Sequence, residues 1–182
     1  MTAAEKDSII LGSGTLFMAE FVTATGIPAD EALEVDGNDI GHIKGGAELT
    51  YTPTEYEVTN DFGHVIRRFI TKEEASFKTG ILTWAMENLA RLCPGVLTTN
   101  NTTHEKVLKI GGASTLKSYV LRFVHTKADT LKLRVTMVAT ASNGFSLAFK
   151  PEAETTVDAQ FKALSQTDGT LIEIREQIAV AG

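Results

Sequence analysis

Cysteine is almost missing from this sequence of 182 residues, which contains Cys93 and no other. One cysteine can form neither an intrachain disulfide nor a multi-cysteine metal site, so a disulfide-stapled secreted scaffold is excluded. Long apolar runs are missing too, since no stretch approaches the roughly 20 apolar residues that a membrane-spanning helix needs. Glu5 and Asp7 precede only a short apolar run, which predicts neither a signal peptide nor a membrane anchor.

A surplus of positive charge is also lacking. The chain carries 17 Lys and Arg against 23 Asp and Glu, which gives a net charge of -6 at pH 7. A general nucleic-acid binder needs a cationic surplus to displace counterions from phosphates, so this class is excluded. A protein that DNA merely passes is compatible with this charge.

Signatures of catalysis and cofactor binding are missing as well. The glycine-rich segment 41–46 completes neither a dinucleotide fingerprint nor a P-loop, and strand-like sequence follows it where a phosphate site needs a helix. The four histidines are scattered without metal-ligand spacing. The sequence therefore predicts no catalytic residue, no metal and no cofactor. Gly41, Gly45 and Gly46 are interpreted as a sheet bend or bulge at the start of a strand.

The strongest periodic signal is the alternation of apolar and polar residues, which is typical of strands with one buried face. It occurs in residues 117–125, 131–137 and 157–163, and more weakly in residues 105–110 and around Ile172 and Ile174. These segments are predicted to be strands.

Turn and loop signals complete this pattern. Asn143 and Gly144 predict a hairpin turn that leads into a strand over 145–149. On the same reading Lys132, Arg134 and Thr136 form the outward face of their strand. The acidic segment 30–39 is interpreted as a solvated connector, and the polar segment 98–104 as an exposed loop.

One segment has helical spacing instead. Apolar residues at 81, 82, 85, 86, 89 and 92 fall on one side of a helix, Thr79 is a plausible N-cap, and Pro94 ends the segment. We therefore predict one helix over about residues 79–92. The length suits a single domain over residues 1–182. The predicted fold is mainly β, an antiparallel β-sandwich or barrel with one flanking α-helix and a long protruding hairpin.

The protruding hairpin is predicted from residues 41–77. Its apolar positions are odd-numbered up to Tyr51 and even-numbered from Tyr56, so the apolar face switches near Pro53. Proline within a sheet is confined to edges and bulges, which predicts a bend at Pro53 and a turn near residues 60–63. The outer part has few apolar residues to bury against its own core, so we expect its partner to be another subunit.

The order of these motifs resembles a known family. The run IGHIKGGAELTY, a proline-interrupted continuation, VIRRFITKEEASFKTGILTWAMENL and a strand-rich second half resemble the tail tube proteins, or major tail proteins, of tailed bacteriophages. The resemblance is clearest over about residues 37–92. It implies a β-sandwich with one flanking helix that assembles into hexameric rings, which stack into a hollow tube through which DNA passes. Contractile tails, bacteriocin-like particles and secretion needles share this architecture.

The resemblance also implies roles for particular residues. The lumen-side sheet would comprise about residues 41–58 and 63–78, and the loop between them would touch the neighbouring subunit or ring. The expected interface residues are Pro53, Thr54, Glu55, Tyr56, Asp61 and Phe62. The family's lumen is typically acidic and repels DNA phosphates, and the lumen-facing candidates are Glu48, Glu55 and Glu57. Basic residues in these segments could instead pair with carboxylates across interfaces, namely Lys44, Arg67, Arg68, Lys72 and Lys78.

The implied partners are further copies of this chain, a tape measure protein, a terminator protein and DNA in transit without specific binding. No membrane is expected, and the implied location is the virion tail, after synthesis in the host bacterial cytoplasm. From the residues alone a second reading stays open, a monomeric β-barrel or sandwich module that binds a small apolar ligand. Its interior would be lined by Phe145, Phe149 and Phe161, although such rings more commonly fill a core.

Overall fold

The computed structural model describes residues 13–112, 115–127, 129–147, 149, 151–152 and 154–179. The strands are β1 (Thr15–Glu20), β2 (Ile43–Thr59), β3 (Val65–Ile81), β4 (Gly95–Asn100), β5 (Glu105–Ile110), β6 (Ser118–Thr126), β7 (Lys132–Ala141), β8 (Val157–Ala163) and β9 (Glu173–Glu176). The helices are α2 (Asp30–Leu33) and α3 (Met86–Leu92).

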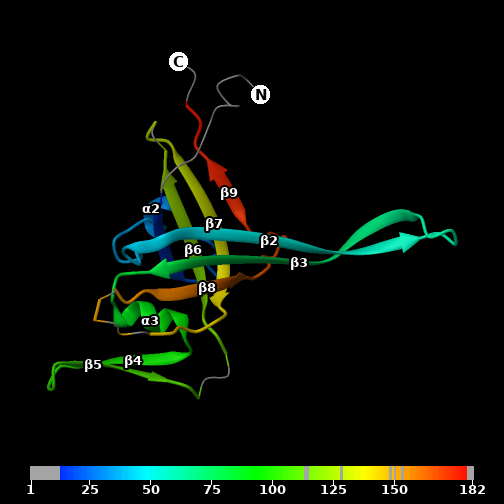
Figure 1. Cartoon of the computed structure of the whole chain (residues 1–182). Helices are drawn as coiled ribbons and strands as arrows, with labels where there is room; N and C mark the ends of the chain where they lie inside the picture. Colours follow the sequence, from blue (N-terminus) through cyan, green and yellow to red (C-terminus); the bar gives the residue numbers. More distant parts are fainter. Residues whose placement is uncertain are drawn as a thin grey trace.

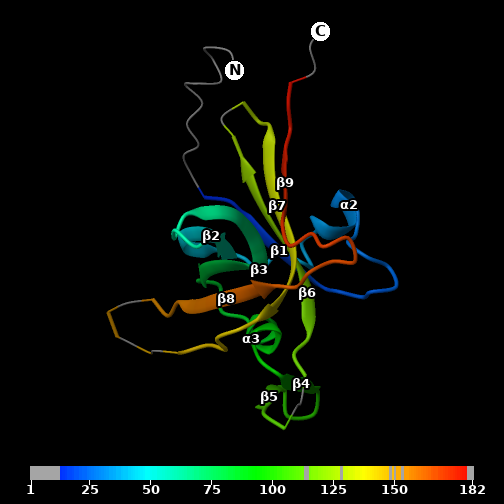
Figure 2. The ribbon, with the colours of Figure 1, turned by 90° about the vertical axis from the view of Figure 1, so that its right-hand side faces the viewer.

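Seven strands form one antiparallel sheet. Their order is β1-β6-β7-β8-β3-β2, and β9 pairs with β7 beside the part of that strand that β8 leaves open. The sheet is strongly coiled, so that β2, β3 and β8 lie across β6 and β7 (Figure 1). β4 and β5 form a separate hairpin at the end of the body opposite β9 (Figure 2). The predicted mainly β, antiparallel fold with a sandwich- or barrel-like arrangement is confirmed.

The core lies between the two halves of the coiled sheet. Phe77 and Phe161 from β3 and β8 pack against Leu121 and Met137 from β6 and β7, and α3 closes one end with Leu92. Leu121, Met137 and Phe161 are apolar members of the predicted alternation, and the inward faces of 117–125 and 157–163 are confirmed. Over 131–137 only Met137 is in the core, whereas Leu131, Leu133 and Val135 are half-buried.

The outward face of β6 and β7 is buried as well, which the sequence interpretation missed. Leu33 of α2 packs on Val120 and Val138, the outward-facing residues of these strands. Arg134 and Thr136, predicted to face outward, are buried beneath the same segment. Residues 30–34 therefore cover the sheet and are not a solvated connector, whereas residues 35–37 and 39 are exposed as predicted.

The predicted helix begins too early, and a second helix was missed. α3 begins at Met86, and Thr79 belongs to β3, where its hydroxyl donates to the carbonyl of Gly46 at 2.9 Å. Sheet pairing takes precedence here because Thr79 and Gly80 lie between β2 and β8 and bond to both. The other helix, α2, has four residues, too short for a recognisable helical period.

One further expectation is wrong. Residues 145–147 and 149 are irregular, because β8 and β9 already pair with β7, and Phe145 and Leu147 pack on the core. The exposed loop predicted at 98–104 is right in part: all of it is exposed and residues 101–104 form a turn, but residues 98–100 end β4. In this turn Asn100 accepts hydrogen bonds from Thr102 and Thr103. The weak strand predicted at 105–110 is confirmed as β5.

Within the described part of the chain, no helix is long and apolar enough to cross a membrane. The same residues contain no group of three or more His, Cys, Asp or Glu side chains that could hold a metal ion.

Candidate assembly surface

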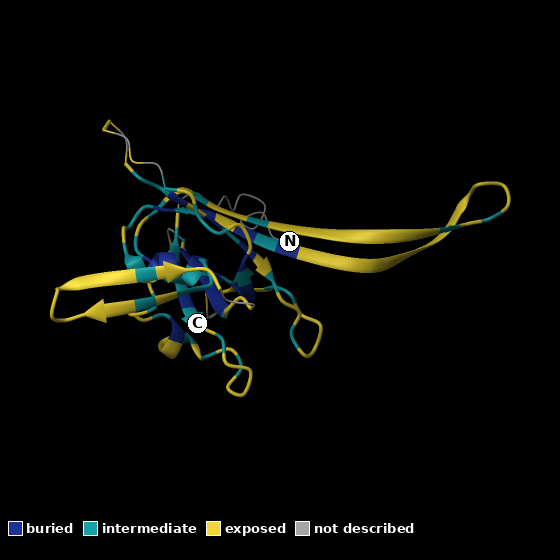
Figure 3. Ribbon diagram, turned by 90° about the horizontal axis from the view of Figure 1, so that it is seen from below, coloured by how far each residue is buried: buried dark blue, intermediate teal, exposed yellow. Residues whose placement is uncertain are grey.

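The long hairpin of β2 and β3 projects far from the body (Figures 1 and 3). Each strand has 17 residues, and the outer part of both is exposed. The turn is held by Asn60, whose side-chain oxygen accepts the N–H groups of Phe62 and His64 at 3.1 and 2.9 Å. Gly63 follows with a φ of +79°. The predicted turn near residues 60–63 is confirmed.

The glycine-rich segment forms a bulge at the start of β2. Gly45 and Gly46 have φ values of +80° and +77°, and the pairing with β3 shifts register between Lys44 and Ala47. Positive φ values favour glycine because side chains with a Cβ are strained there. The interpretation of these glycines as a bend in the sheet is confirmed.

Just before this bulge, Gly41 is fixed by a neighbouring side chain. Its φ is +88°, and a Cβ on it would collide with Thr83, whose hydroxyl accepts the N–H of His42 at 2.7 Å. The hairpin therefore leaves the body through a backbone path that requires glycine for both conformation and space.

The stem of the hairpin, nearest the body, has one apolar and one polar face. Odd-numbered residues face the core, and Ala75 and Phe77 are buried there. Even-numbered residues form the opposite face, on which Glu48 stands across from Lys78 and Thr50 across from Ser76. Two open grooves of about 410 and 370 Å³ lie along this polar face, and β8 contributes Gln160 to both.

A second bulge reverses the faces of the hairpin. Thr54 pairs with Lys72 and Glu55 pairs with Ile70, so Thr71 is an extra residue in β3. Its hydroxyl donates to the carbonyl of Thr54 at 3.1 Å. The extra residue places Phe69 opposite Tyr56, on the face that is polar in the stem. The predicted switch of the apolar face near Pro53 is confirmed, and Pro53 lies in an edge strand.

Beyond this bulge, residues 55–70 form what we call the tip. Tyr56 is 61% exposed, Ile66 63% and Phe62 86%. The tip therefore exposes several large apolar side chains to water. All six expected interface residues are exposed, with Pro53 and Thr54 at the end of the stem, and Glu55, Tyr56, Asp61 and Phe62 in the tip.

The lumen-facing candidates lie on two different faces. Glu48 belongs to the polar face of the stem, whereas Glu55 and Glu57 lie on the other side of the hairpin. There Arg68 approaches Glu57 at 2.8 Å and Glu55 at 3.7 Å. The alternative of pairing with carboxylates thus applies within the chain to Arg68, and also to Lys44, which pairs with Glu154.

Two other charged contacts lie in the stem. Lys72 bonds Glu74 at 2.7 Å, which holds the pKa of that carboxyl below its usual value. On the opposite face the Tyr51 hydroxyl donates to Glu73 at 2.5 Å, and this bond raises the pKa of Tyr51. These contacts are exposed, so each contributes little to stability.

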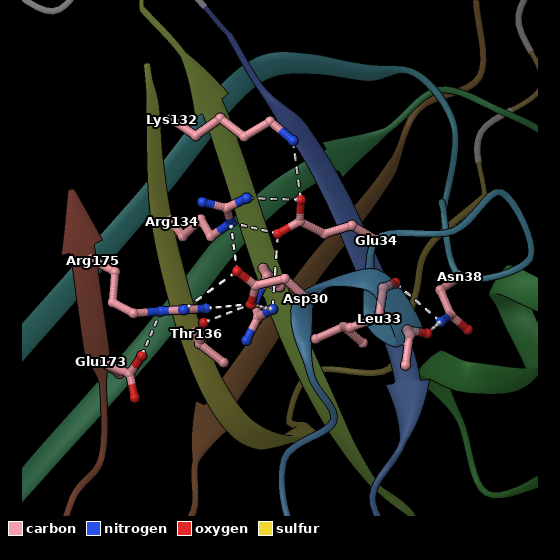
Figure 4. Close-up of polar contacts among 11 residues, drawn as sticks. Asp30, Leu33, Glu34, Asn38, Lys132, Arg134, Thr136, Glu173 and Arg175 are labelled. Atoms are coloured by element: carbon pink, nitrogen blue, oxygen red, sulfur yellow. Dashed lines mark hydrogen bonds and ion pairs between the residues drawn. The ribbon is translucent and has the colours of Figure 1, made fainter. Parts of the chain in front are cut away.

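A buried group of charges beneath α2 is the feature that sequence reasoning missed most completely. We call it the ion-pair layer; its residues are Asp30, Glu34, Arg122, Lys132, Arg134, Thr136 and Arg175 (Figure 4). Arg134 bonds Glu34 at 2.5 Å, and Arg122 bonds Asp30 at the same distance. The layer joins α2 to β6, β7 and β9.

These contacts change the acidity of both carboxyls. Hydrogen bonding from Arg175, with the charges of Arg122 and Arg134, holds the pKa of Asp30 below its ordinary value against the opposing effect of burial. Burial is the largest influence on Glu34 and raises its pKa, but the bonds and charges of Arg134 and Lys132 outweigh it and lower the pKa. Both carboxylates therefore stay charged, and the layer holds the body together.

The aromatic residues of the ligand-binding alternative do not share a cavity. Phe161 is fully buried in the core, Phe145 packs against that core, and Phe149 is 76% exposed. A depression bounded by β3, α3 and Val157 has a volume of only about 10 Å³.

No protein-family model matches the chain, and no curated protein matches it at a significant level. The geometry of the hairpin and of the body therefore carries the functional argument.

Proposed function

We propose that this chain is a structural subunit that assembles with copies of itself into stacked hexameric rings, forming a hollow tube of the phage tail type through which DNA passes. The observation that carries the proposal is the tip. It projects beyond the body and exposes apolar side chains such as Tyr56, Phe62 and Ile66. Apolar surface in water is unfavourable by roughly 25 cal/mol per Å², so such a projection is suited to burial in a second chain.

The open edge of β2 supports the same proposal. β2 is the last strand of the sheet, and its unpaired backbone groups run the length of the hairpin. A long edge strand is a template for pairing with another chain. In the proposed ring these edges meet neighbouring subunits, and tape measure and terminator proteins contact the ends of the tube. The mature protein would lie in the virion tail.

The proposed role needs no catalysis and no cofactor. For DNA to pass through the tube, the wall must not bind phosphates tightly. The polar face of the stem meets this requirement. Along that face Lys72 bonds Glu74 and Lys78 stands opposite Glu48, so its cations lie beside carboxylates. A cation that is already paired with a carboxylate neutralises DNA phosphates poorly. It therefore releases few of the counterions condensed on DNA and gives little affinity for DNA.

Electron microscopy of the concentrated protein tests the proposal. Negative staining should show rings or tubes with a central hole. A matched variant replaces residues 55–71 with Asn-Gly and so connects Thr54 to Lys72, which already face each other across the hairpin. This variant should keep the circular dichroism spectrum of the body and remain monomeric.

Two results would count against the proposal. A wild-type protein that stays monomeric at every concentration overturns it and favours the ligand-binding module. Tubes that form normally from the shortened variant would show that the tip is not the contact.

A further inference from the structure

The tip has one apolar face, and the bulge at Thr71 creates it. In β2 the residues alternate without interruption, so Tyr56 and Val58 share a face. Without the extra residue in β3, Phe69 would point to the other side. With it, Phe69 stands opposite Tyr56, and the two strands present their apolar side chains together.

This apolar face carries one cation. Arg67 pairs with Val58 in the ladder and lies over the ring of Phe69, 4.8 Å from its centroid. The described residues give Arg67 no ion pair. The opposite face differs, since Glu55 and Glu57 already bond Arg68 there. The face with the unpaired cation is thus the one that still lacks a partner.

The tip cannot use its own body as that partner. It extends away from the rest of the molecule (Figures 1 and 3). The stem that would have to fold back is a continuous ladder of 17-residue strands joined by backbone hydrogen bonds. None of the described residues covers Tyr56 and Phe69, so the surface that covers them is sought on another molecule.

A matching surface lies where β9 pairs with β7. Val135 of β7 stands opposite Ile174 of β9, and Leu133 stands opposite Glu176. All four share the face that forms the core further along β7. Here the core has ended, because β8 pairs only with the far end of β7, from Ala139 onward.

Leu133 and Val135 are half-buried, whereas the β9 side of this surface is exposed. Ile174 is 61% exposed, and Ile178, just beyond β9, is 82% exposed. Glu176 bonds Lys127 at 2.5 Å, but its side chain is 54% exposed and a carboxylate can accept further hydrogen bonds. We name Leu133, Val135, Ile174 and Glu176 the acceptor face.

We propose that the apolar face of the tip docks on the acceptor face of a second copy of this chain, with Tyr56 and Phe69 against Val135 and Ile174 and Arg67 beside Glu176. The inference rests on the proposed function and specifies its contact. The match is apolar to apolar, with the cation of the tip meeting the carboxylate of the acceptor face.

The complementarity also fixes the type of symmetry. Two tips facing each other would bring Arg67 against Arg67, and two acceptor faces would bring Glu176 against Glu176. A tip on an acceptor face avoids both repulsions. Such a contact joins two different surfaces. Each copy can therefore bind one neighbour through its tip and another through its acceptor face, and repeating this contact gives rings or filaments.

A mixing experiment tests this arrangement. Tyr56→Lys disables the tip, and Ile174→Lys disables the acceptor face; both positions are exposed, so each variant should fold. Each variant alone should be monomeric in sedimentation velocity. An equimolar mixture should give a one-to-one dimer and nothing larger, because one intact tip meets one intact acceptor face.

Matched controls separate the faces. Ile70→Lys changes an equally exposed apolar residue of the tip on the face of Glu55, and Val96→Lys changes an exposed residue of β4. Both should assemble like the wild type. A mixture of Tyr56→Lys and Ile174→Lys that remains monomeric would overturn the docking of these two faces. So would a loss of assembly in both controls equal to that in Tyr56→Lys and Ile174→Lys.

Charge reversal gives an independent readout. Arg67→Glu and Glu176→Arg should each weaken self-association by about tenfold, and the double variant should regain most of it. If rings form and neither reversal weakens them, this contact is wrong while the proposed tube function stands. A wild-type protein without self-association overturns both.

Discussion

The ion-pair layer and the tip use the same side chains in opposite surroundings. In the layer, Arg122 and Arg134 are 2% and 8% exposed and bond carboxylates of α2. In the tip, Arg68 bonds Glu57 at a similar distance, but that pair is exposed. An alternating pattern with arginine on one face of a strand therefore does not show whether those arginine side chains are buried. What determines it is whether another segment covers that face, and in the tip no segment of the described chain does.

The largest effect expected from this comparison follows from breaking one pair in each region. Glu34→Ala removes the carboxylate closest to the buried Arg134, leaves only Asp30 at 3.5 Å, and should reduce the free energy of unfolding by about 3 kcal/mol. Arg68→Ala removes an exposed pair and should change it by less than about 0.5 kcal/mol. Urea unfolding of both variants, each made in the monomeric Tyr56→Lys background, measures the difference. Equal losses would show that burial of the layer is not what distinguishes the regions.

The same comparison explains what could be predicted from the sequence. The hairpin was predictable because its signals are local: positive-φ glycines at Gly45 and Gly46, the change of apolar phase near Pro53, and turn residues at 60–63. The inward faces of β6 and β8 followed from their alternation. These features depend on neighbours in sequence.

The ion-pair layer was not predictable in this way. Asp30 and Arg122 are far apart in the chain, and Arg175 is farther still. A polar residue at every second position of a strand is interpreted as facing solvent, unless it is known that another segment of the chain covers that face. One signal was available: Arg122, Arg134 and Arg175 each occupy such a position, and an acidic segment of matching charge occurs at 30–34. The position of Phe69 on the same face as Tyr56 was likewise not predictable, because the bulge at Thr71 has no distinctive residue type.

The junction between body and hairpin offers an intermediate effect. Gly41→Ala forces a Cβ into Thr83 at a φ of +88° and should destabilise the protein by about 2 kcal/mol. Gly45→Ala has a similar φ but no atom within 4 Å of its Cβ, so about 1 kcal/mol is expected from backbone strain. Thermal unfolding of the two variants compares them. A larger loss at Gly45 would mean that the bulge in β2, and not the contact with Thr83, sets the path of the hairpin.

The smallest effect is a difference in acid sensitivity between the two regions. The pKa values of Asp30 and Glu34 are lowered in the folded protein, so their pairing stabilises it fully above their ordinary pKa values of 3.8 and 4.5. Stability is lost as the pH falls through the lower folded values, because the unfolded chain then binds protons more readily. We expect the midpoint of urea unfolding to drop below about pH 4 in the wild type, and the drop to be smaller in Glu34→Gln, which has no carboxylate to protonate. Glu57→Gln in the tip should keep the full drop. If Glu34→Gln loses stability with acid as steeply as the wild type, Glu34 does not contribute to the acid response of the layer, and the contrast between buried and exposed charges would rest on Asp30 alone.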